Sequence, residues 1–171
     1  AGTPRRVTVA DASHNLSGFT PEGDALLFSS FQERDIYREE RMYRAPLDGG
    51  PVARLTDAFG EHPVMSADGE RVVLARGSNT TFRPVYRGTA TGEIWSFEPS
   101  SGSFFRLTTD TSDDMQPHPL PDGSTLYIGS SEGQYNLTKH TPGAWQADVL
   151  ADFKPTGGET PLAHGARDLD V

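Results

Sequence analysis

Apolar residues in this chain come in short clusters, and three of the clusters follow a glycine-containing turn of the same kind. The turns are Pro21-Glu22-Gly23, Ala67-Asp68-Gly69 and Pro121-Asp122-Gly123. The clusters after them are ALLFSS, RVVLAR and TLYIGS. Glycine tolerates the positive φ that a tight hairpin connection demands. The pattern therefore predicts three β-hairpins, each with an apolar second strand.

A second marker, an Arg-hydrophobic-Thr triplet, recurs at Arg6, Arg54 and Arg106, and in each copy the hydrophobic residue lies five residues after a turn glycine. Third strands are expected in RMYRAPL and EIWSFEP, where Met42 and Ile94 occupy the same place. Each unit then has four strands in roughly 50 residues, and four-stranded antiparallel units with a period of about 40–50 are typical of β-propeller blades. We predict an all-β fold, an arc of about three four-stranded antiparallel blades.

The repeat also predicts the organisation of the chain. The segments are residues 1–8 as the last strand of a preceding blade, 9–56, 57–108 and 109–163 as three blades, and 164–171 as the start of a following blade. The third blade closes either at Gly143, with residues 147–150 as its fourth strand, or at Gly157-Gly158. A closed propeller needs at least four blades. We therefore expect a larger ring, completed by further sequence or by another chain.

Composition narrows the function classes. Hydrophobic residues make up 35% of the chain, and 18 Gly and 13 Pro are spread through it, which suits short strands and turns. The net charge of −9 repels phosphate backbones, so no nucleic-acid partner is expected. No cysteine is present for disulfides or thiolate–metal sites, and no run approaches the ~20 apolar residues of a membrane span. The opening AGTPRR suggests a processed protein or a piece of a longer one.

The repeated motif resembles the propeller repeats of the TolB and tricorn-type families, the WD40-like PD40 repeats. In that pattern two glycines, four variable residues and Leu-Thr precede an acidic loop, a Pro, Ser-Pro-Asp-Gly and a hydrophobic strand. The stretch GGPVARLTDAFGEHPVMSADGERVVLA follows it, with Ala67 in place of the usual Pro. The third copy keeps Pro121-Asp122-Gly123 but has Leu120 in place of Ser. The resemblance implies a β-propeller.

A narrower resemblance, to the propeller of bacterial tricorn-like serine peptidases of the S41 class, rests on the insertion RGSNTTFRPVYRGTATGE before the strand EIW. In that class, propellers precede a PDZ module and the protease domain. The resemblance implies a non-catalytic module that gates or docks peptide substrate and contacts other blades and domains of the same protein. A TolB-like periplasmic protein-binding propeller, or the propeller of a prolyl-oligopeptidase-like hydrolase, stays open. The location implied is periplasmic or secreted, with a cytoplasmic one still open.

A nucleophile-elbow pattern, G-x-S-x-G, occurs at residues 129–133 with Ser131 at its centre. That chemistry needs a strand, a sharp turn that exposes the serine, and then a helix. The residues after Gly133 alternate like a strand and stop at Pro-Gly. The pattern favours an ordinary hairpin loop, and we expect no catalytic residue in this chain.

Histidines offer a second candidate. His14, His62 and His118 lie on the innermost strands at odd distances from the turn glycine, so ideal strands would point them to one face. A two-residue stagger of about 6.6 Å exceeds the ~2.0–2.1 Å of a zinc–nitrogen bond, which favours polar channel lining over a shared metal site. No metal and no cofactor is expected.

An acidic segment, DTSDDMQP, contains Asp110, Asp113 and Asp114. It lacks the central glycine and alternating oxygen ligands of a calcium loop. We predict a solvated loop at the channel mouth.

The insertion itself is the strongest candidate for binding. It interrupts the connection between the second and third strands of its blade and carries Phe82, Arg83, Tyr86 and Arg87. Aromatic and arginine side chains are enriched at protein interfaces. We predict that these four residues contact another domain or a substrate peptide. An oligomer of the chain stays open. The alternative is that they pack between neighbouring blades.

Overall fold

The computed structural model describes residues 3–33, 39–77, 83–108, 112–131, 133–143 and 148–151 of the 171-residue chain. Within these ranges there are twelve strands and no helix, so none of the described segments is a helix able to cross a membrane. The strands form three four-stranded antiparallel sheets, each with its strands in chain order. This succession of sheets confirms the predicted all-β arc.

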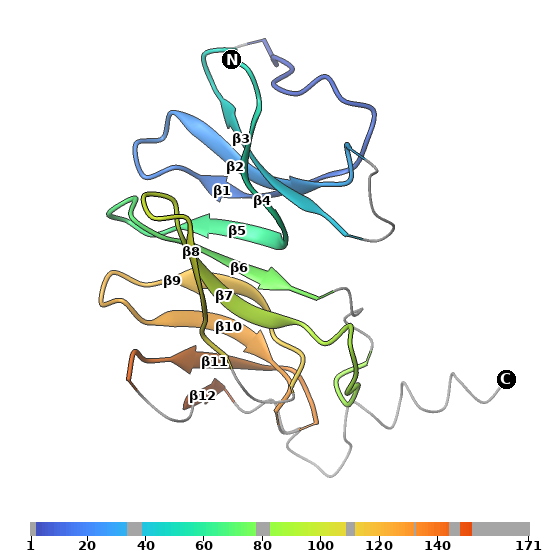
Figure 1. The fold of residues 1–171 in the computed structure, drawn as a ribbon, viewed down its shortest axis with the longest axis vertical. Coiled ribbons are helices and arrows are strands. Elements are labelled where there is room, and N and C mark those ends of the chain that lie inside the picture. Colours follow the sequence, from blue (N-terminus) through green and yellow to red (C-terminus); the bar gives the residue numbers. More distant parts are fainter. Residues whose placement is uncertain are drawn as a thin grey trace, which may run out of the picture.

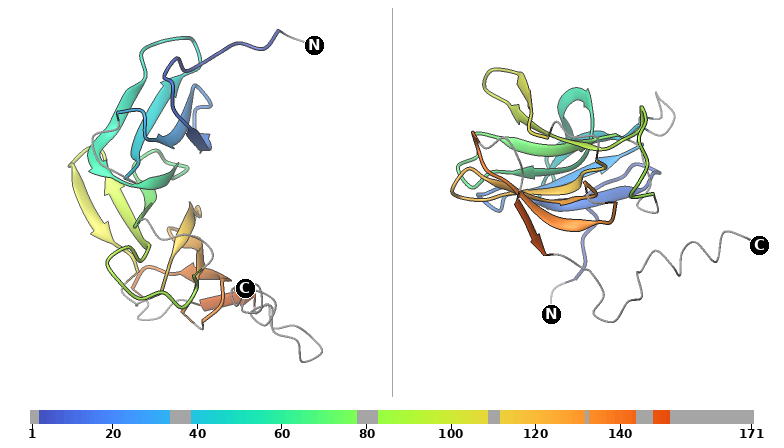
Figure 2. Two further views of the ribbon diagram at one scale, coloured as in Figure 1. Left: turned by 90° about the vertical axis from the view of Figure 1, so that its right-hand side faces the viewer. Right: turned by 90° about the horizontal axis from the view of Figure 1, so that it is seen from below.

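The first sheet consists of β1 (His14–Phe19), β2 (Ala25–Ser30), β3 (Arg41–Pro46) and β4 (Ala53–Phe59). The second consists of β5 (Glu61–Met65), β6 (Val72–Arg76), β7 (Glu93–Glu98) and β8 (Ser103–Arg106). The third consists of β9 (Met115–Pro119), β10 (Thr125–Gly129), β11 (Asn136–His140) and β12 (Asp148–Ala151). The sheets stack on one another (Figure 1), and the stack follows a curve (Figure 2, left). The first strands lie toward its concave side, and β4 and β8 toward its convex side (Figure 2).

The three predicted hairpin turns have one hydrogen-bonding scheme. In each, the turn glycine donates its N–H to the carbonyl oxygen three residues earlier, at 2.9–3.0 Å: Gly23 to Thr20, Gly69 to Ser66 and Gly123 to Leu120. The φ angles of the three glycines are 69°, 75° and 83°. A side chain is strained in this region, which explains why each turn contains glycine.

Each junction between sheets is filled by an aliphatic side chain from the third strand of the preceding sheet. Met42 of β3 is fully buried in a cluster with Val72 and Leu74 of the second sheet. Ile94 of β7 is fully buried in a cluster with Tyr127 of the third sheet. Burying such a side chain stabilises the fold by about 1.5–3 kcal/mol. The two positions are those that the repeat predicts to be equivalent.

Two of the Arg-hydrophobic-Thr triplets lie at these junctions, and the first lies against the first sheet. Their hydrophobic residues pack against the cluster of the sheet that follows: Val7 on the first sheet, Leu55 on the second and Leu107 on the third. Arg6 Nε donates to the Thr8 carbonyl at 2.6 Å, and Arg106 Nε to the Thr108 carbonyl at 2.7 Å. Residues 3–10 belong to no strand. The last strand of a preceding blade, and the blade boundaries, stay predictions.

The third unit agrees with the first of the two predicted closures. Gly143 has a φ of 80°, and β12 follows it at Asp148–Ala151, paired with β11. The alternative closing turn, Gly157-Gly158, lies outside the described residues.

Gly60 tests the junction between the first two sheets. A Cβ at this buried position would lie 2.7 Å from Leu74 Cδ1 and 3.1 Å from Met42 Cε, inside the packed cluster. We expect Gly60→Ala to lower the free energy of unfolding by about 1–3 kcal/mol, because an added methyl group overpacks this core. Chemical denaturation measures the effect. Gly18→Ala is the control, since a Cβ there has nothing within 4 Å. Equal losses in the two variants would contradict the prediction.

Candidate functional site

The connection between β6 and β7 leaves and re-enters the second sheet through a glycine neck. Gly77 follows β6 with a φ of 135°, and a Cβ on it would lie 2.6 Å from Gly92 Cα. Neither position has room for a side chain. We call this connection between β6 and β7 the insertion. The edge of the sheets that carries it is called the insertion rim. The opposite edge, with the turns that contain Gly23, Gly69 and Gly123, is called the hairpin rim.

The neck is anchored to the third sheet by Asp113. The Gly92 N–H donates to Asp113 Oδ1 at 2.7 Å, and the Asp114 N–H donates to the Gly92 carbonyl at 2.9 Å. The Asp113 N–H in turn donates to Ser130 Oγ at 2.9 Å. Asp113 therefore joins the neck of the insertion to the loop after β10.

A second link runs through Tyr135. Its hydroxyl donates to Asp113 Oδ2 at 2.8 Å and also hydrogen-bonds the backbone of Arg83. Burial and the Asp113 carboxylate raise the pKa of Tyr135, so the hydroxyl stays protonated. Val85 Cγ1 lies 3.8 Å from where a Cβ on Gly133 would be. The described part of the insertion thus contacts residues of the third unit.

The four residues predicted to bind a partner differ in their placement. Phe82 lies outside the described residues, Arg83 and Arg87 are exposed, and Tyr86 is half-buried. Arg87 Nη1 donates to the carbonyls of Pro84 and Tyr86 at 3.2 and 2.8 Å. Arg87 therefore stabilises its own loop. Contact of these residues with a partner stays a prediction.

A groove of about 380 Å³ lies beside the insertion. Gly88, Thr89 and Thr91 of the insertion form one wall. The remaining lining consists of Glu39, Phe59, Arg76, Gly77, Glu93 and Trp95, from the first two sheets and the connections next to them. Sequence reasoning placed the candidate site on the insertion and missed these residues. A signal that could have indicated the groove was the presence of two aromatic residues, Phe59 and Trp95, on strands of the first and second sheets.

Arginines cover both aromatic rings of the groove. Arg76 Cζ lies 5.2 Å from the centroid of the Trp95 ring, and Arg41 Cζ lies 4.2 Å from that of Phe59. Such cation–π contacts contribute about 0.5–1 kcal/mol at exposed sites. The groove therefore has flat, partly polar walls.

The two carboxylates of the groove differ in what they bind. Glu93 Oε1 pairs with Arg106 Nη2 at 2.7 Å, and Glu93 Oε2 accepts from Trp95 Nε1 at 3.3 Å. Glu39 is half-buried and forms no ion pair with any other residue that the structure describes. Glu39 is thus the carboxylate that a ligand in the groove can reach.

Further carboxyl groups lie near the groove, together with the arginines described above. Glu40 is 4% exposed, and its Oε1 accepts from Asn15 Nδ2 at 2.7 Å. Burial raises the pKa of Glu61 to about 7, helped by the charges of Glu40, Glu39 and Asp113. Burial lowers the pKa of His62, which the charge of Glu40 partly offsets. The charge of the insertion rim therefore changes near neutral pH.

The prediction of a solvated acidic loop is wrong for Asp113 and Asp114. Each is 1% exposed. Asp113 accepts the two hydrogen bonds described above, and Ser112 Oγ donates to Asp114 Oδ1 at 2.6 Å. Buried carboxylates need such partners, which the surrounding sheets supply here. Asp110 lies outside the described residues.

The three histidines lie on the first strands of the sheets, as predicted, but bulges interrupt the alternation there. The register shifts in β1, β5 and β9, and His62 has a φ of 52°. His14 Nδ1 hydrogen-bonds Ser30 Oγ at 3.0 Å, whereas His118 is exposed. In the described part of the chain, no group of three His, Cys, Asp or Glu side chains is placed to hold a metal ion.

Ser131 is exposed in the connection between β10 and β11, which pair directly with each other. A strand follows this serine, where a nucleophile elbow would have a helix. The connection is the ordinary hairpin that the repeat predicts.

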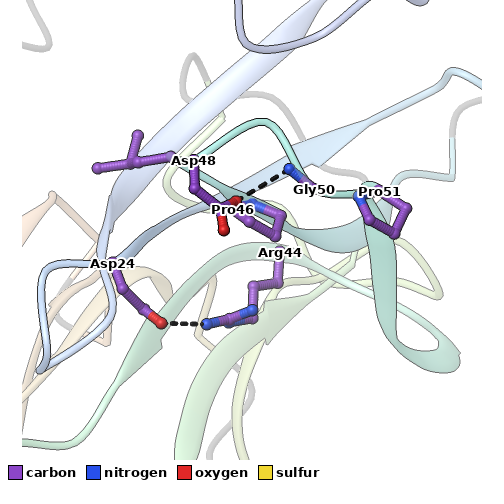
Figure 3. A pocket seen from close by; sticks show the side chains of 7 residues that line it. Asp24, Arg44, Pro46, Asp48, Gly50 and Pro51 are labelled. Carbon is purple, nitrogen blue, oxygen red and sulfur yellow. Dashed lines mark hydrogen bonds and ion pairs between the residues drawn. The ribbon is translucent and has the colours of Figure 1, made fainter.

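The hairpin rim has its own cleft, of about 620 Å³, in the first sheet. Its polar groups bind one another (Figure 3): Arg44 pairs with Asp24 at 2.8 Å, and Asp48 Oδ1 accepts the Gly50 N–H at 2.9 Å. None of the residues that line this cleft is aromatic, so the groove on the insertion rim is the better candidate for a binding site.

Three solved structures show what this arrangement resembles. TolB from Acinetobacter baumannii has a TM-score of 0.69 and 18% identity, and the match covers 88% of this chain and 35% of the TolB chain. The tricorn protease has a TM-score of 0.68 and 20% identity, and the match covers 82% of this chain and 13% of the tricorn chain. A puromycin-hydrolysing peptidase of Mycobacterium tuberculosis has a TM-score of 0.61 and 14% identity, and the match covers 84% of this chain and 22% of the peptidase. Neither a protein-family model nor a curated protein sequence matches the chain.

The chain spans about a third or less of these three proteins, so the likeness concerns one region of each. At identities of 14–20%, the likeness establishes the fold alone. The chain has the fold of a partial β-propeller, with structural neighbours in TolB and the tricorn protease.

Proposed function

We propose that this chain is a non-catalytic β-propeller module that docks a peptide or protein segment at its insertion rim. The groove beside the insertion carries the proposal, because it combines two aromatic rings, each in contact with an arginine, with a half-buried carboxylate, Glu39. Aromatic surface supplies contact area for a side chain, and a carboxylate orients a cationic group. Glu39 is the carboxylate that a cationic group would meet, so the ligand that we propose is an extended segment that contains a basic residue.

The resemblance of the insertion to S41-class propellers supports a place in a tricorn-like serine peptidase. There the module would gate or dock substrate for a protease domain and contact other domains of the same protein. The likeness to TolB, at a TM-score of 0.69, equally supports a protein-binding propeller, in a periplasmic or secreted setting. The likeness to a puromycin-hydrolysing peptidase keeps the propeller of a prolyl-oligopeptidase-like hydrolase as a further alternative.

Protonation of Glu61 adjusts the charge that a docked segment meets. The pKa of this carboxyl is about 7 against an ordinary 4.5, so the folded protein retains a proton that the unfolded chain has lost. The protonated form contributes stability below about pH 4.5, and this contribution is lost as the pH rises through about 7. At alkaline pH, the rim carries one more negative charge.

Binding is tested with fluorescein-labelled peptides of equal length that contain either lysine or glutamate, measured by fluorescence anisotropy. We expect the lysine peptides to bind more tightly, and Glu39→Gln to weaken their binding about 2- to 5-fold through loss of one partly exposed charge contact. Glu70→Gln, at an exposed position on the hairpin rim, is the matched control. Equal binding of both peptide types, or equal effects of both variants, would count against this site.

Hydrolysis is tested separately, on the same chain and the same peptides. We expect no cleavage in a mass-spectrometric assay, and no change with Ser131→Ala, because this serine stands in a hairpin loop. Cleavage that Ser131→Ala abolishes would overturn the non-catalytic proposal.

The titration of Glu61 is tested by urea denaturation at a series of pH values. Relative to wild type, Glu61→Gln should gain about 1–3 kcal/mol of unfolding free energy between pH 4.5 and pH 8, because it removes a buried charge. The lowered pKa of His62 acts with the opposite sign, favouring the folded state as the pH rises. Since both proteins contain His62, their difference isolates Glu61. Parallel stability curves would show that Glu61 titrates normally.

A further inference from the structure

The groove on the insertion rim contains a cation that its neighbouring carboxylate does not neutralise. Arg76 ends β6 and lies directly opposite Glu93 of β7, a position where unlike charges usually attract each other. Glu93 binds elsewhere, because its two carboxylate oxygens accept from Arg106 Nη2 and Trp95 Nε1. Among the residues that the structure describes, no carboxylate forms an ion pair with Arg76.

The guanidinium of Arg76 is held instead by the Trp95 ring. Arg76 Cζ lies 5.2 Å from the ring centroid, in a cation–π contact. Arg76 is exposed and Trp95 is half-buried, and both residues line the groove. A guanidinium over an aromatic ring still presents N–H donors, and its planar fork matches the two oxygens of a carboxylate. Arg76 therefore offers the groove a positioned group for an anion.

The repeat does not require an arginine at this position. In each sheet one residue stands seven positions after the turn glycine: Ser30, Arg76 and Ser130. The two serines are 1% and 0% exposed, and each hydrogen-bonds the backbone just before the first strand of its own sheet. Arg76 is exposed and departs from this packing role. Its presence in the groove points to a function other than folding.

We propose that the segment docked in the groove carries an acidic side chain for Arg76 as well as a basic side chain for Glu39. This inference rests on the proposed function and names the class of ligand: an extended peptide with one acidic and one basic residue close together in sequence. Glu39 and Arg76 line one groove, and no ion pair joins them in the described part of the chain. Each can therefore pair with a group of the ligand. A carboxylate suits the groove better than a phosphate, because Glu39 repels additional negative charge.

Peptides with an N-terminal fluorescein and a C-terminal amide, which have no free termini, test the proposal by fluorescence anisotropy. Each peptide contains one lysine and, one, two or three residues from it, either aspartate or asparagine. At one spacing or more, we expect the aspartate peptide to bind about 2- to 5-fold more tightly than its asparagine counterpart, as for a partly exposed charge contact. Binding of the lysine peptides without a preference for aspartate at any spacing would overturn this inference and leave the proposed function standing. Absence of binding by every peptide would overturn both.

Substitutions of Arg76 show whether this residue causes the preference. Arg76→Gln should abolish the preference for aspartate over asparagine, while lysine peptides still bind more tightly than glutamate peptides. Arg76→Lys should keep only part of the preference, because an ammonium lacks the planar fork. Arg71→Gln, between the turn of the second sheet and β6 on the hairpin rim, is the matched control and should bind like the wild type. The preference is a ratio measured on one protein, so a change in the folded fraction does not alter it. An unchanged ratio in Arg76→Gln would contradict the assignment.

Discussion

The arc depends on the burial of both faces of its middle sheet. In β6, Val72 and Leu74 point to the first sheet, while Val73 and Ala75 point away from it, and all four are buried. A single four-stranded sheet cannot bury two faces by itself, so the middle sheet depends on both of its neighbours. This constraint explains why the second strands are continuous apolar runs instead of alternating ones. It also explains why Gly60 is needed where Met42 and Leu74 meet.

Because packing uses the strand faces, the connections and strand ends are left for binding. The insertion rim is built on buried polar contacts that keep these connections in place. Asp113 accepts hydrogen bonds from the Gly92 backbone and the Tyr135 hydroxyl, which lie on different sheets. A carboxylate removed from water costs several kcal/mol unless charged or polar partners compensate it. These donors make Asp113 a fixed link between the second and third sheets.

The sequence predicted the sheets because their signals are local. Turn glycines such as Gly69 and the apolar strands after them depend on neighbours a few residues away, and so do triplets such as Arg106-Leu107-Thr108. The burial of Asp113 and Asp114 could not be predicted in this way, since the Tyr135 hydroxyl is 22 residues distant and the Gly92 N–H is 21 residues distant. An acidic segment is usually solvated, and only the assembled sheets supply the donors that reverse this.

The groove was missed for a related reason: its walls come from separate units. Phe59 ends β4 of the first sheet, Trp95 belongs to β7, and Thr91 precedes the neck that Asp113 holds. The groove therefore exists only when the first two sheets are packed together and the third anchors the neck. A ligand bound there interacts with the assembled arc and not with the unfolded chain, so binding stabilises the arc by RT ln(1 + [L]/Kd). Ligand binding in the groove and packing of the sheets are therefore linked, and Trp95 takes part in both because it also packs against the Met42 cluster.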